Sequence, residues 1–406
     1  MDIKKVKSQF PIFSKKINGK TLVYLDSSNS SQKPANVLKT LDYFYKNEFS
    51  NIGRSIHTLA VNATNKFEET RTNVKNFINA DSKNEIIFTK NATESINLVA
   101  STFGQQNINK GDEILITELE HHSNYVPWYY LKETKGAVIK FAPINEDGDI
   151  IIDKFKELIT SKTKIIAITH LSNVTGTIVP IKEIVEIARK KNIPVLVDGC
   201  QSAPHIKIDV KDLDCDFYAI SCHKVYGPTG VGILYGKKKW LEKLPPFIGG
   251  GGMINEVKKN KITYASLPEK YEAGTMPTAE VVAFNESIKF MQSVGIENIM
   301  RHEKEITEYA LEKLKRINSV NIVGNPKNKA GVISFTMKGI HPHDISTIVD
   351  EEGVAIRAGH HCCQILHERL KLTATARASI GVYNNKDDID VLCKAIENCR
   401  KVFGLK

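Results

Sequence analysis

The sequence contains no long hydrophobic run. No stretch of about 18 or more apolar residues occurs, so a membrane-spanning helix of ordinary length is not expected. The first residues, MDIKKVKSQFPIF, lack the apolar segment of a secretory signal. We therefore expect a cytoplasmic protein, and the 406 residues are enough for one large domain and a smaller one.

The sequence also lacks a cysteine pattern typical of disulfides. The chain has seven cysteines, an odd number, and none of them form a C-x-x-C pair. In a chain of this size without a signal peptide, reduced thiols are expected rather than a disulfide framework. Most of them should be buried as small hydrophobic side chains. The seven are Cys200, Cys215, Cys222, Cys362, Cys363, Cys393 and Cys399.

The chain has no concentrated basic stripe, although its formal net charge is +10. Lysines far outnumber arginines, occur in short groups such as KKINGK and KKNK, and are interspersed with acids. This pattern favours a solvated lysine-rich surface over a nucleic-acid interface. An acidic partner protein or an anionic cofactor fits the sign of the charge.

From about residue 85, short apolar runs such as EIIFT, EILIT and PVLVDG alternate with amphipathic stretches. Strands that alternate with helices predict an α/β fold with a mostly parallel sheet covered on both faces. Ligands of such sheets bind at the carboxyl ends of the strands. A Gly- and Pro-rich segment at about 245–275 predicts a long loop or hairpin. The helices and strands after it predict a second, smaller α+β domain.

Asp198 and Lys224 follow two successive predicted strands, in VLVDGCQSAPH and DFYAISCHKVYGPTG. A carboxylate keeps a pyridinium nitrogen protonated, and a lysine amine forms a Schiff base with an aldehyde. These are the two groups that pyridoxal 5'-phosphate (PLP) requires. Alone, such an Asp is usually a cap or turn residue and such a Lys a surface charge. Their positions at successive strand ends favour a PLP site.

The turn KNATESINLVA predicts a capped helix that can bind an anion. Asn91 is the expected cap, and Glu94 would complete a capping box. The free backbone N–H groups and the positive end of the helix suit a phosphate, to which Thr93 could add a hydroxyl. A plain capped helix is the alternative.

Two adjacent histidines, His121 and His122, follow another predicted strand, in ELEHHSN. One imidazole there can stack on an aromatic cofactor. A metal pair is less favoured, because adjacent residues after a strand point in opposite directions.

The segment IRAGHHCCQ predicts a reactive cysteine. Cys362 lies between imidazoles and basic groups, which can hold it partly as the nucleophilic thiolate. A zinc site from His360 to Cys363 is disfavoured, since four consecutive residues do not easily converge on one tetrahedral ion. Arg377, in ATARAS, can clamp a substrate carboxylate with two hydrogen bonds, although a lone arginine is usually a surface charge.

These motifs resemble those of the SUF-type cysteine desulfurases, a group within the class V aminotransferase-like, fold-type I PLP enzymes. The resemblance runs nearly end to end, and the order and spacing of the motifs are highly specific. It implies a large PLP-binding domain over residues 21–275 with a seven-stranded sheet, and a small domain over 276–406 joined by residues 1–20. The motifs are YLDSSNSSQKP, NIGRSIHTLA, NATESINLVA, ELEHHSNYVPW, VDGCQSAPH, SCHKVYGPTGVGILYG, YEAGTMP, RAGHHC and ATARASIGVYN.

The resemblance also implies how PLP is held. Lys224 would be the Schiff-base lysine, and Asp198 would pair with the pyridinium nitrogen. Gln201 would contact the ring hydroxyl, and His121 would stack on the ring and assist proton transfers. Thr275 would reach the phosphate bound by the partner subunit, which implies a homodimer. The residues that would hold the phosphate within one subunit are Thr93, Ser221 and His223.

The implied reaction converts L-cysteine to L-alanine. Asn173 and Arg377 would hold the substrate carboxylate, and Lys224 would remove the α-proton. The Cys362 thiolate would attack the substrate sulfur and keep it as a persulfide for iron–sulfur cluster assembly. A selenocysteine lyase on the same fold is the alternative, because the same residues serve both substrates. A zinc-binding protein and a catalytically weak binding partner are further rivals.

Three departures from the family pattern lie near the implied active site. Ser28-Asn29 replaces the usual Ala-Ala, and Gly53 replaces a His, so substrate access or turnover should differ from that of the family. Cys363 replaces the usual Ala after the nucleophile, and is either a second thiol or only a small side chain.

His343, in GIHPHDIS, indicates which kind of sulfur acceptor the protein serves. It stands nineteen positions (362 − 343) before Cys362. Members of the family with a histidine here resemble those that serve a zinc-bearing, SufU-like acceptor. The histidine would take over a zinc position and free an acceptor cysteine for attack. A helix cap or a solvent-exposed histidine is the alternative, with a SufE-like acceptor that carries no zinc.

Overall fold

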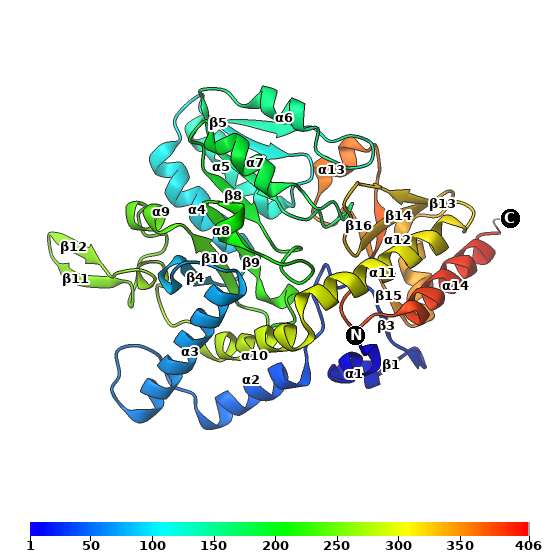
Figure 1. The fold of residues 1–406 in the computed structure, drawn as a ribbon, viewed down its shortest axis with the longest axis horizontal. Helices are drawn as coiled ribbons and strands as arrows, with labels where there is room; N and C mark the ends of the chain where they lie inside the picture. The colour runs from blue at the N-terminus through cyan, green and yellow to red at the C-terminus, as the bar shows by residue number, and fades with distance from the viewer. Residues whose placement is uncertain (405–406) are drawn as a thin grey trace.

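The computed structural model describes residues 1–404 and has two separate main sheets (Figure 1). The larger has seven strands in the order β4-β10-β9-β8-β7-β5-β6. Neighbours from β9 to β6 run parallel, whereas β10 is antiparallel to both β9 and β4. The predicted α/β fold with a mostly parallel seven-stranded sheet is confirmed. The strands are β4 (Ile86–Thr89), β5 (Glu113–Thr117), β6 (Val138–Ala142), β7 (Thr163–Thr169), β8 (Val195–Asp198), β9 (Phe217–Ser221) and β10 (Gly232–Gly236).

The large sheet is buried on both faces. Along β8, Val195 and Val197 belong to one hydrophobic cluster and Leu196 to another. Because both faces are covered, the strands are continuous apolar runs rather than alternating ones. One face is covered by α4 (Ala92–Asn107), α5 (Val126–Lys135) and α9 (Lys238–Lys243). The other is covered by α3 (Thr58–Phe77), α6 (Ile152–Leu158), α7 (Ile181–Arg189), α8 (Val210–Leu213) and α10 (Thr278–Val294).

The small sheet has four antiparallel strands in the order β13-β14-β17-β16. It packs against α11, α12 and α14 around a hydrophobic cluster of its own (Figure 1). The strands are β13 (Val320–Val323), β14 (Val332–Met337), β16 (Arg357–Gly359) and β17 (Thr375–Ser379). The helices are α11 (Ile296–Lys315), α12 (Pro342–Glu351) and α14 (Lys386–Val402), and α13 (Gln364–Arg369) lies between β16 and β17 in the chain.

The N-terminal segment contacts both parts of the molecule. Val6 and Phe10 belong to a cluster of the large sheet, whereas β3 pairs in parallel with β15 beside the small sheet. α10 begins after residue 275, yet it packs on α2 and α3. The division into 21–275 and 276–406 stays a prediction. The elements concerned are α1 (Ile3–Lys7), β1 (Lys16–Ile17), β2 (Lys20–Thr21), β3 (Val23–Tyr24), α2 (Ala35–Asn47) and β15 (Val354–Ala355).

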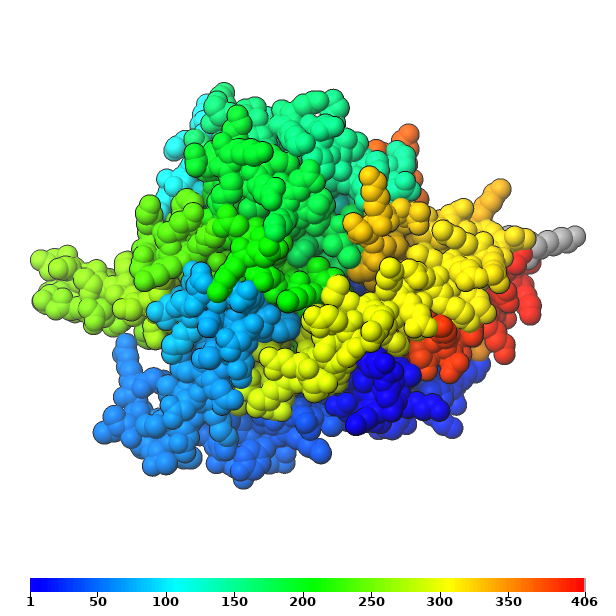
Figure 2. Space-filling view, viewed as in Figure 1, coloured from blue at the N-terminus to red at the C-terminus, as the bar shows by residue number. Residues whose placement is uncertain are grey.

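The predicted long loop or hairpin is a hairpin. β11 (Ile254–Lys258) and β12 (Lys261–Tyr264) pair antiparallel and project from the body of the molecule (Figure 2). Within residues 1–404, no helix is long and apolar enough to cross a membrane.

A buried ion pair anchors the segment that follows the hairpin. Arg71 of α3 donates from Nη1 and Nη2 to the two carboxylate oxygens of Glu272, at 2.7 and 2.8 Å. Glu272 also accepts from the backbone N–H of Phe88 in β4, at 2.7 Å. Both charged side chains are nearly inaccessible to solvent. The pair therefore joins a helix, a strand and the loop before Thr275.

We expect the Glu272→Ala variant to lose about 3 kcal/mol of unfolding free energy, because it removes the buried carboxylate that pairs with both Nη atoms of Arg71 and leaves only the partly exposed Glu68, which accepts from Nε. Urea unfolding followed by circular dichroism measures the loss. Glu157→Ala is the control, since it breaks an exposed pair with Lys154 and should not change the midpoint. A Glu272→Ala midpoint equal to that of the control would contradict a structural role for the pair.

Candidate active site

A cavity of about 300 Å³ lies where the carboxyl ends of the large-sheet strands face the small sheet. Asn173 follows β7, Asp198 ends β8, and Lys224 follows β9. The parallel strands thus bring side chains that are far apart in the sequence to one edge. Of the other predicted site residues, the cavity is also lined by Thr93, His121, Gln201, Ser221 and His223, and by Cys362 and Arg377 from the small-sheet part.

Thr275 does not line this cavity. It lines a second, separate cavity together with Arg71, Glu272 and residues 51–55. Within one chain, the structure therefore brings together all the predicted site residues except Thr275.

Buried polar atoms without a partner collect at the first cavity. Within residues 1–404, four residues that line it have a side-chain nitrogen or oxygen that is buried and makes no hydrogen bond. Buried polar groups are almost always paired in folded proteins, so these atoms indicate a polar ligand. They are Ser28 Oγ, Gln201 Oε1, His361 Nδ1 and Arg377 Nε.

The start of α4 forms one wall. Asn91 caps the helix, as predicted, by accepting from Glu94 N at 2.9 Å. The predicted capping box is wrong, because the Glu94 carboxylate accepts from Lys90 N, one residue before the cap. The backbone of Asn91 itself is fully extended (φ −175°). Ser221 Oγ accepts from Ala92 N at 2.9 Å, which joins the end of β9 to the helix start.

The lysine and the aspartate that are predicted to bind PLP also line the cavity. Asp198 is buried, and its Oδ1 accepts from Cys200 N at 3.0 Å. Lys224 is half-buried in a 3-10 turn (Cys222–Lys224) directly after β9. Among the described residues, its amine makes no ion pair with a carboxylate, which leaves the nitrogen available for a covalent bond.

His121 is a neutral imidazole with a defined tautomer. Its Nδ1 accepts from Ser123 N at 3.1 Å, so a neutral ring carries its proton on Nε2. Burial, reinforced by the charge of Lys224, lowers the pKa of His121 to about 3. His122 is adjacent but tilted by 50°, with ring centroids 6.3 Å apart. No group of three metal-binding side chains occurs in the part of the chain described.

Cys362 is the only half-exposed cysteine of the seven; the others are buried. It lies in a tight turn in which His361 (φ 53°) and Cys362 (φ 58°) both adopt the left-handed conformation. This conformation is costly for residues other than glycine and indicates that surrounding contacts hold the turn. His122 N donates to Cys362 O at 2.7 Å. Arg357 Nη2 lies 4.0 Å from the Cys362 sulfur.

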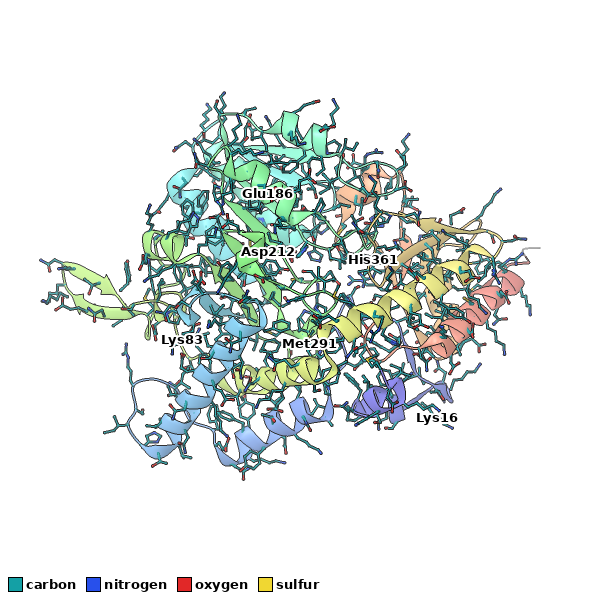
Figure 3. All side chains as sticks on the ribbon, viewed as in Figure 1. Lys16, Lys83, Glu186, Asp212, Met291 and His361 are labelled. Carbon is teal, nitrogen blue, oxygen red and sulfur yellow. The ribbon has the colours of Figure 1, made fainter. Side chains whose placement is uncertain are left out.

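A hydrogen-bond chain sets the proton position on His361. His367 Nδ1 is 2.9 Å from Cys363 O, and since a carbonyl only accepts, Nδ1 carries the proton. His367 Nε2 then accepts from the Thr375 hydroxyl, whose oxygen accepts from His361 Nε2 at 2.9 Å. Burial lowers the pKa of His361 to about 2, so its Nδ1 is an unprotonated acceptor. His361 lies on the side of the small sheet nearer the large sheet (Figure 3).

Arg377 reaches the cavity from β17. It is 1% exposed, and burial lowers its pKa. Its Nη1 donates to Asn173 O at 3.1 Å and its Nη2 to Asp26 Oδ1 at 3.0 Å. Asn29 Oδ1 accepts from Arg357 Nη1 at 2.8 Å, so the residue that departs from the family pattern contacts the arginine beside Cys362.

Sequence reasoning missed several residues of the site. The sequence patterns assign no role to Asp26 or Arg357, although both stand inside the motifs YLDSSNSSQKP and RAGHHC. Ser28 and Asn29 were noted only as departures. The available signal was their position within motifs whose other members line the cavity.

Comparison with known proteins assigns the family. The model of the family described as aminotransferase class-V matches residues 23–392. A probable cysteine desulfurase of Halalkalibacterium halodurans is 46% identical over 404 residues, covering 100% of this chain and 99% of its own. The crystal structure of the Escherichia coli cysteine desulfurase CsdA has a TM-score of 0.92 at 34% identity, with 99% of each chain covered. The cysteine desulfurase of Thermococcus onnurineus has a TM-score of 0.93 at 33% identity, with 98% of each chain covered.

The match over nearly the whole chain agrees with the cavity that Lys224, Asp198 and Cys362 line together. The chain belongs to the class-V aminotransferase family, and within it to the PLP-dependent cysteine desulfurases.

Proposed function

We propose that this protein is a SUF-type cysteine desulfurase. It converts L-cysteine to L-alanine, keeps the sulfur as a persulfide on Cys362, and passes it to an acceptor protein for iron–sulfur cluster assembly. The observation that carries the proposal is that Lys224, Asp198 and the half-exposed Cys362 line one cavity. Selenocysteine as the preferred substrate is the alternative, and competition between the two amino acids separates the two.

The residues around the cavity fit PLP. Asp198 would pair with the pyridinium nitrogen, Lys224 would attach the aldehyde carbon, and Gln201 has a buried oxygen without a partner among the described residues. When bound, PLP supplies an electron sink for the electrons released at the substrate α-carbon. The phosphate would be held by Thr93, Ser221 and His223, beside the start of α4.

The chain's own groups carry the remaining chemistry. Arg377 and Asn173 hold the substrate carboxylate, Lys224 removes the proton from the α-carbon, and His121 assists proton transfers. The Cys362 thiolate attacks the substrate sulfur. A sulfur–sulfur bond forms as the carbon–sulfur bond breaks, and the electron pair of that bond stays with the carbon fragment, which leaves as alanine after protonation. Arg357 supplies positive charge beside the attacking sulfur.

The same proposal includes a homodimer, in which Thr275 serves the site of the partner subunit. Several large apolar side chains are exposed on one chain, and burial of such side chains against a partner subunit would remove them from water. Ile56 is 95% exposed, and the hairpin β11–β12 adds Val257 and Ile262. Further exposed members on and between α2 and α3 are Leu38, Tyr43, Tyr45, Phe49, Leu59 and Val61.

Substitutions at Lys224 and Cys362 separate cofactor attachment from sulfur transfer. Lys224→Ala should lose both the visible absorption of bound PLP and the formation of alanine. Cys362→Ala should retain the absorption but form no persulfide, because the thiolate acts after the cofactor-dependent steps. Spectroscopy and mass spectrometry of cysteine-treated protein provide the two readouts. Cys393→Ala, a buried cysteine of α14 that does not line the cavity, is the control and should behave as wild type. Extra sulfur on any cysteine but Cys362 would contradict the assignment.

Replacing Arg377 with Lys should raise KM for L-cysteine by about tenfold or more, because a point charge cannot make the two parallel hydrogen bonds of a guanidinium to a carboxylate. Steady-state kinetics measures the change, with the melting temperature as a check on folding. Arg369→Lys, on α13, is the matched control and should leave KM unchanged. A KM within twofold of wild type for Arg377→Lys would remove Arg377 from the substrate site.

For the acceptor, we propose a SufU-like protein with zinc, through His343. It is His341 that caps α12, by accepting from His343 N at 3.3 Å, so the alternative that His343 caps the helix is wrong. The His343 side chain is exposed, and its ring stacks on that of His341 at 5.3 Å. α12 packs against β16, the strand that leads to Cys362. An exposed imidazole is a suitable zinc ligand.

His343→Ala should keep basal cysteine turnover and lose stimulation by a SufU-like protein. Sulfide release from L-cysteine, measured with and without the acceptor, tests this. Glu351→Ala, an exposed residue at the other end of α12, is the control and should remain stimulated. Equal stimulation of His343→Ala and wild type would contradict the proposal and favour a SufE-like acceptor.

A further inference from the structure

Cys363, which stands where the family usually has alanine, makes a specific buried contact. Its side chain is 0% exposed, and its sulfur lies 3.1 Å from Asn173 Oδ1. Burial raises the pKa of the Cys363 thiol well above its ordinary value. The sulfur therefore keeps its proton and donates it to the amide oxygen, as a weak S–H donor.

The other end of the same amide is engaged as well. Asn173 Nδ2 donates to His361 O at 2.8 Å, and this carbonyl precedes Cys362 in the chain. A flipped amide would turn its oxygen toward the carbonyl of His361 and its nitrogen toward the Cys363 thiol. Both hydrogen bonds would be lost, so the two contacts together fix the amide orientation.

We propose that Cys363 is a positioning residue for the desulfurase reaction: its thiol orients the Asn173 amide, which in turn holds the turn of Cys362 and directs an N–H toward the substrate carboxylate. The inference rests on the proposed function in one respect, the role of Asn173 in carboxylate binding. It assigns the departure at position 363 a function other than filling space.

The turn of the nucleophile needs such support. His361 and Cys362 are both left-handed, a conformation that is unfavourable for residues other than glycine. The Asn173 amide ties the carbonyl of His361 to the segment after β7. Arg377 holds the same segment by donating to Asn173 O at 3.1 Å. Cys363 thus acts on the residue that connects the turn, the large sheet and the carboxylate-binding arginine.

The same geometry excludes Cys363 as a second sulfur carrier. Transfer of sulfur from a persulfide requires a thiolate on the receiving cysteine. The Cys363 sulfur is fully buried, protonated and engaged with Asn173, whereas Cys362 is half-exposed. Sulfur therefore stays on Cys362 until the acceptor removes it.

The test compares alanine with serine at position 363. Cys363→Ala should raise KM for L-cysteine by about three- to fivefold with little change in kcat, the effect of losing one neutral hydrogen bond. Cys363→Ser should restore KM to within about twofold of wild type, because its hydroxyl can donate to the same oxygen. If position 363 only fills space, alanine should behave as wild type and serine no better. Cys399→Ala, a buried cysteine of α14, is the control for removing a thiol elsewhere.

Two further measurements keep the outcome decisive. In an Asn173→Ala background, Cys363→Ala should raise KM no further, since the thiol acts through that amide. Binding of L-alanine, measured by calorimetry, should weaken by the same factor as KM rises, and this readout does not depend on turnover. Melting temperatures show whether Cys363→Ala is unfolded. If it is, the KM of Cys363→Ser and the calorimetry decide whether the thiol positions Asn173.

The inference is overturned by a wild-type KM in Cys363→Ala, by failure of serine to restore KM, by additive effects with Asn173→Ala, or by persulfide on Cys363. Failure of the proposed function looks different: wild-type protein would then form neither alanine nor a Cys362 persulfide from L-cysteine, whatever stands at position 363.

Discussion

The buried guanidinium of Arg377 holds the two parts of the protein together around the active-site cavity. Arg377 belongs to β17 of the small sheet, yet it donates to Asn173 O after β7 and to Asp26 near the N-terminus. A buried cation without such partners costs several kcal/mol, so these contacts restrict how the two sheets can pack. The cavity forms in that packing arrangement, which makes the geometry of the site a property of the whole chain.

The electrostatics of the cavity follow from the same burial. Lys224, Arg357 and Arg377 line it as cations, whereas burial, reinforced by neighbouring cations, keeps three imidazoles neutral. The pKa is lowered to about 3 in His121, about 4 in His223 and about 2 in His361. A region of positive potential with neutral hydrogen-bonding rings suits ligands that carry a phosphate or a carboxylate. The imidazoles in it orient groups and accept hydrogen bonds without adding charge.

The turn of Cys362 shows how the fold supports an unfavourable local conformation. Two consecutive left-handed residues place the cysteine at the mouth of the cavity, and neighbours from three segments hold them. His122 binds the carbonyl of Cys362, and Asn173 binds that of His361. His367 binds the carbonyl of Cys363 at 2.9 Å. The nucleophile is thereby fixed by the large sheet although it is carried by the small-sheet part, and strain at this point is supported by packing elsewhere.

Much of the fold followed from local patterns. The apolar runs predicted the strands because a sheet buried on both faces requires them, and Asn91 predicted a helix start because its side chain caps the N–H groups of its own next turn. Lys224 and Asp198 could be assigned to one site because successive parallel strands end at one edge. Each of these inferences depends on neighbours in the sequence or on a general property of parallel sheets.

The contacts that complete the site depend on tertiary structure alone. Cys363 contacts Asn173, which is 190 residues away in the sequence, and Arg377 contacts Asp26, which is 351 residues away. The Glu94 carboxylate accepts a hydrogen bond from Lys90 N rather than from the N–H of the cap residue Asn91. The residue that caps α12 is His341 rather than His343. The sequence by itself determined the architecture, the family resemblance and which residue types gather at the strand ends. Tertiary structure decided which polar atoms are paired, which remain free to bind a ligand, and which nitrogen of each imidazole carries the proton. These outcomes depend on distances of about 3 Å between segments that only the packing of the two sheets brings together.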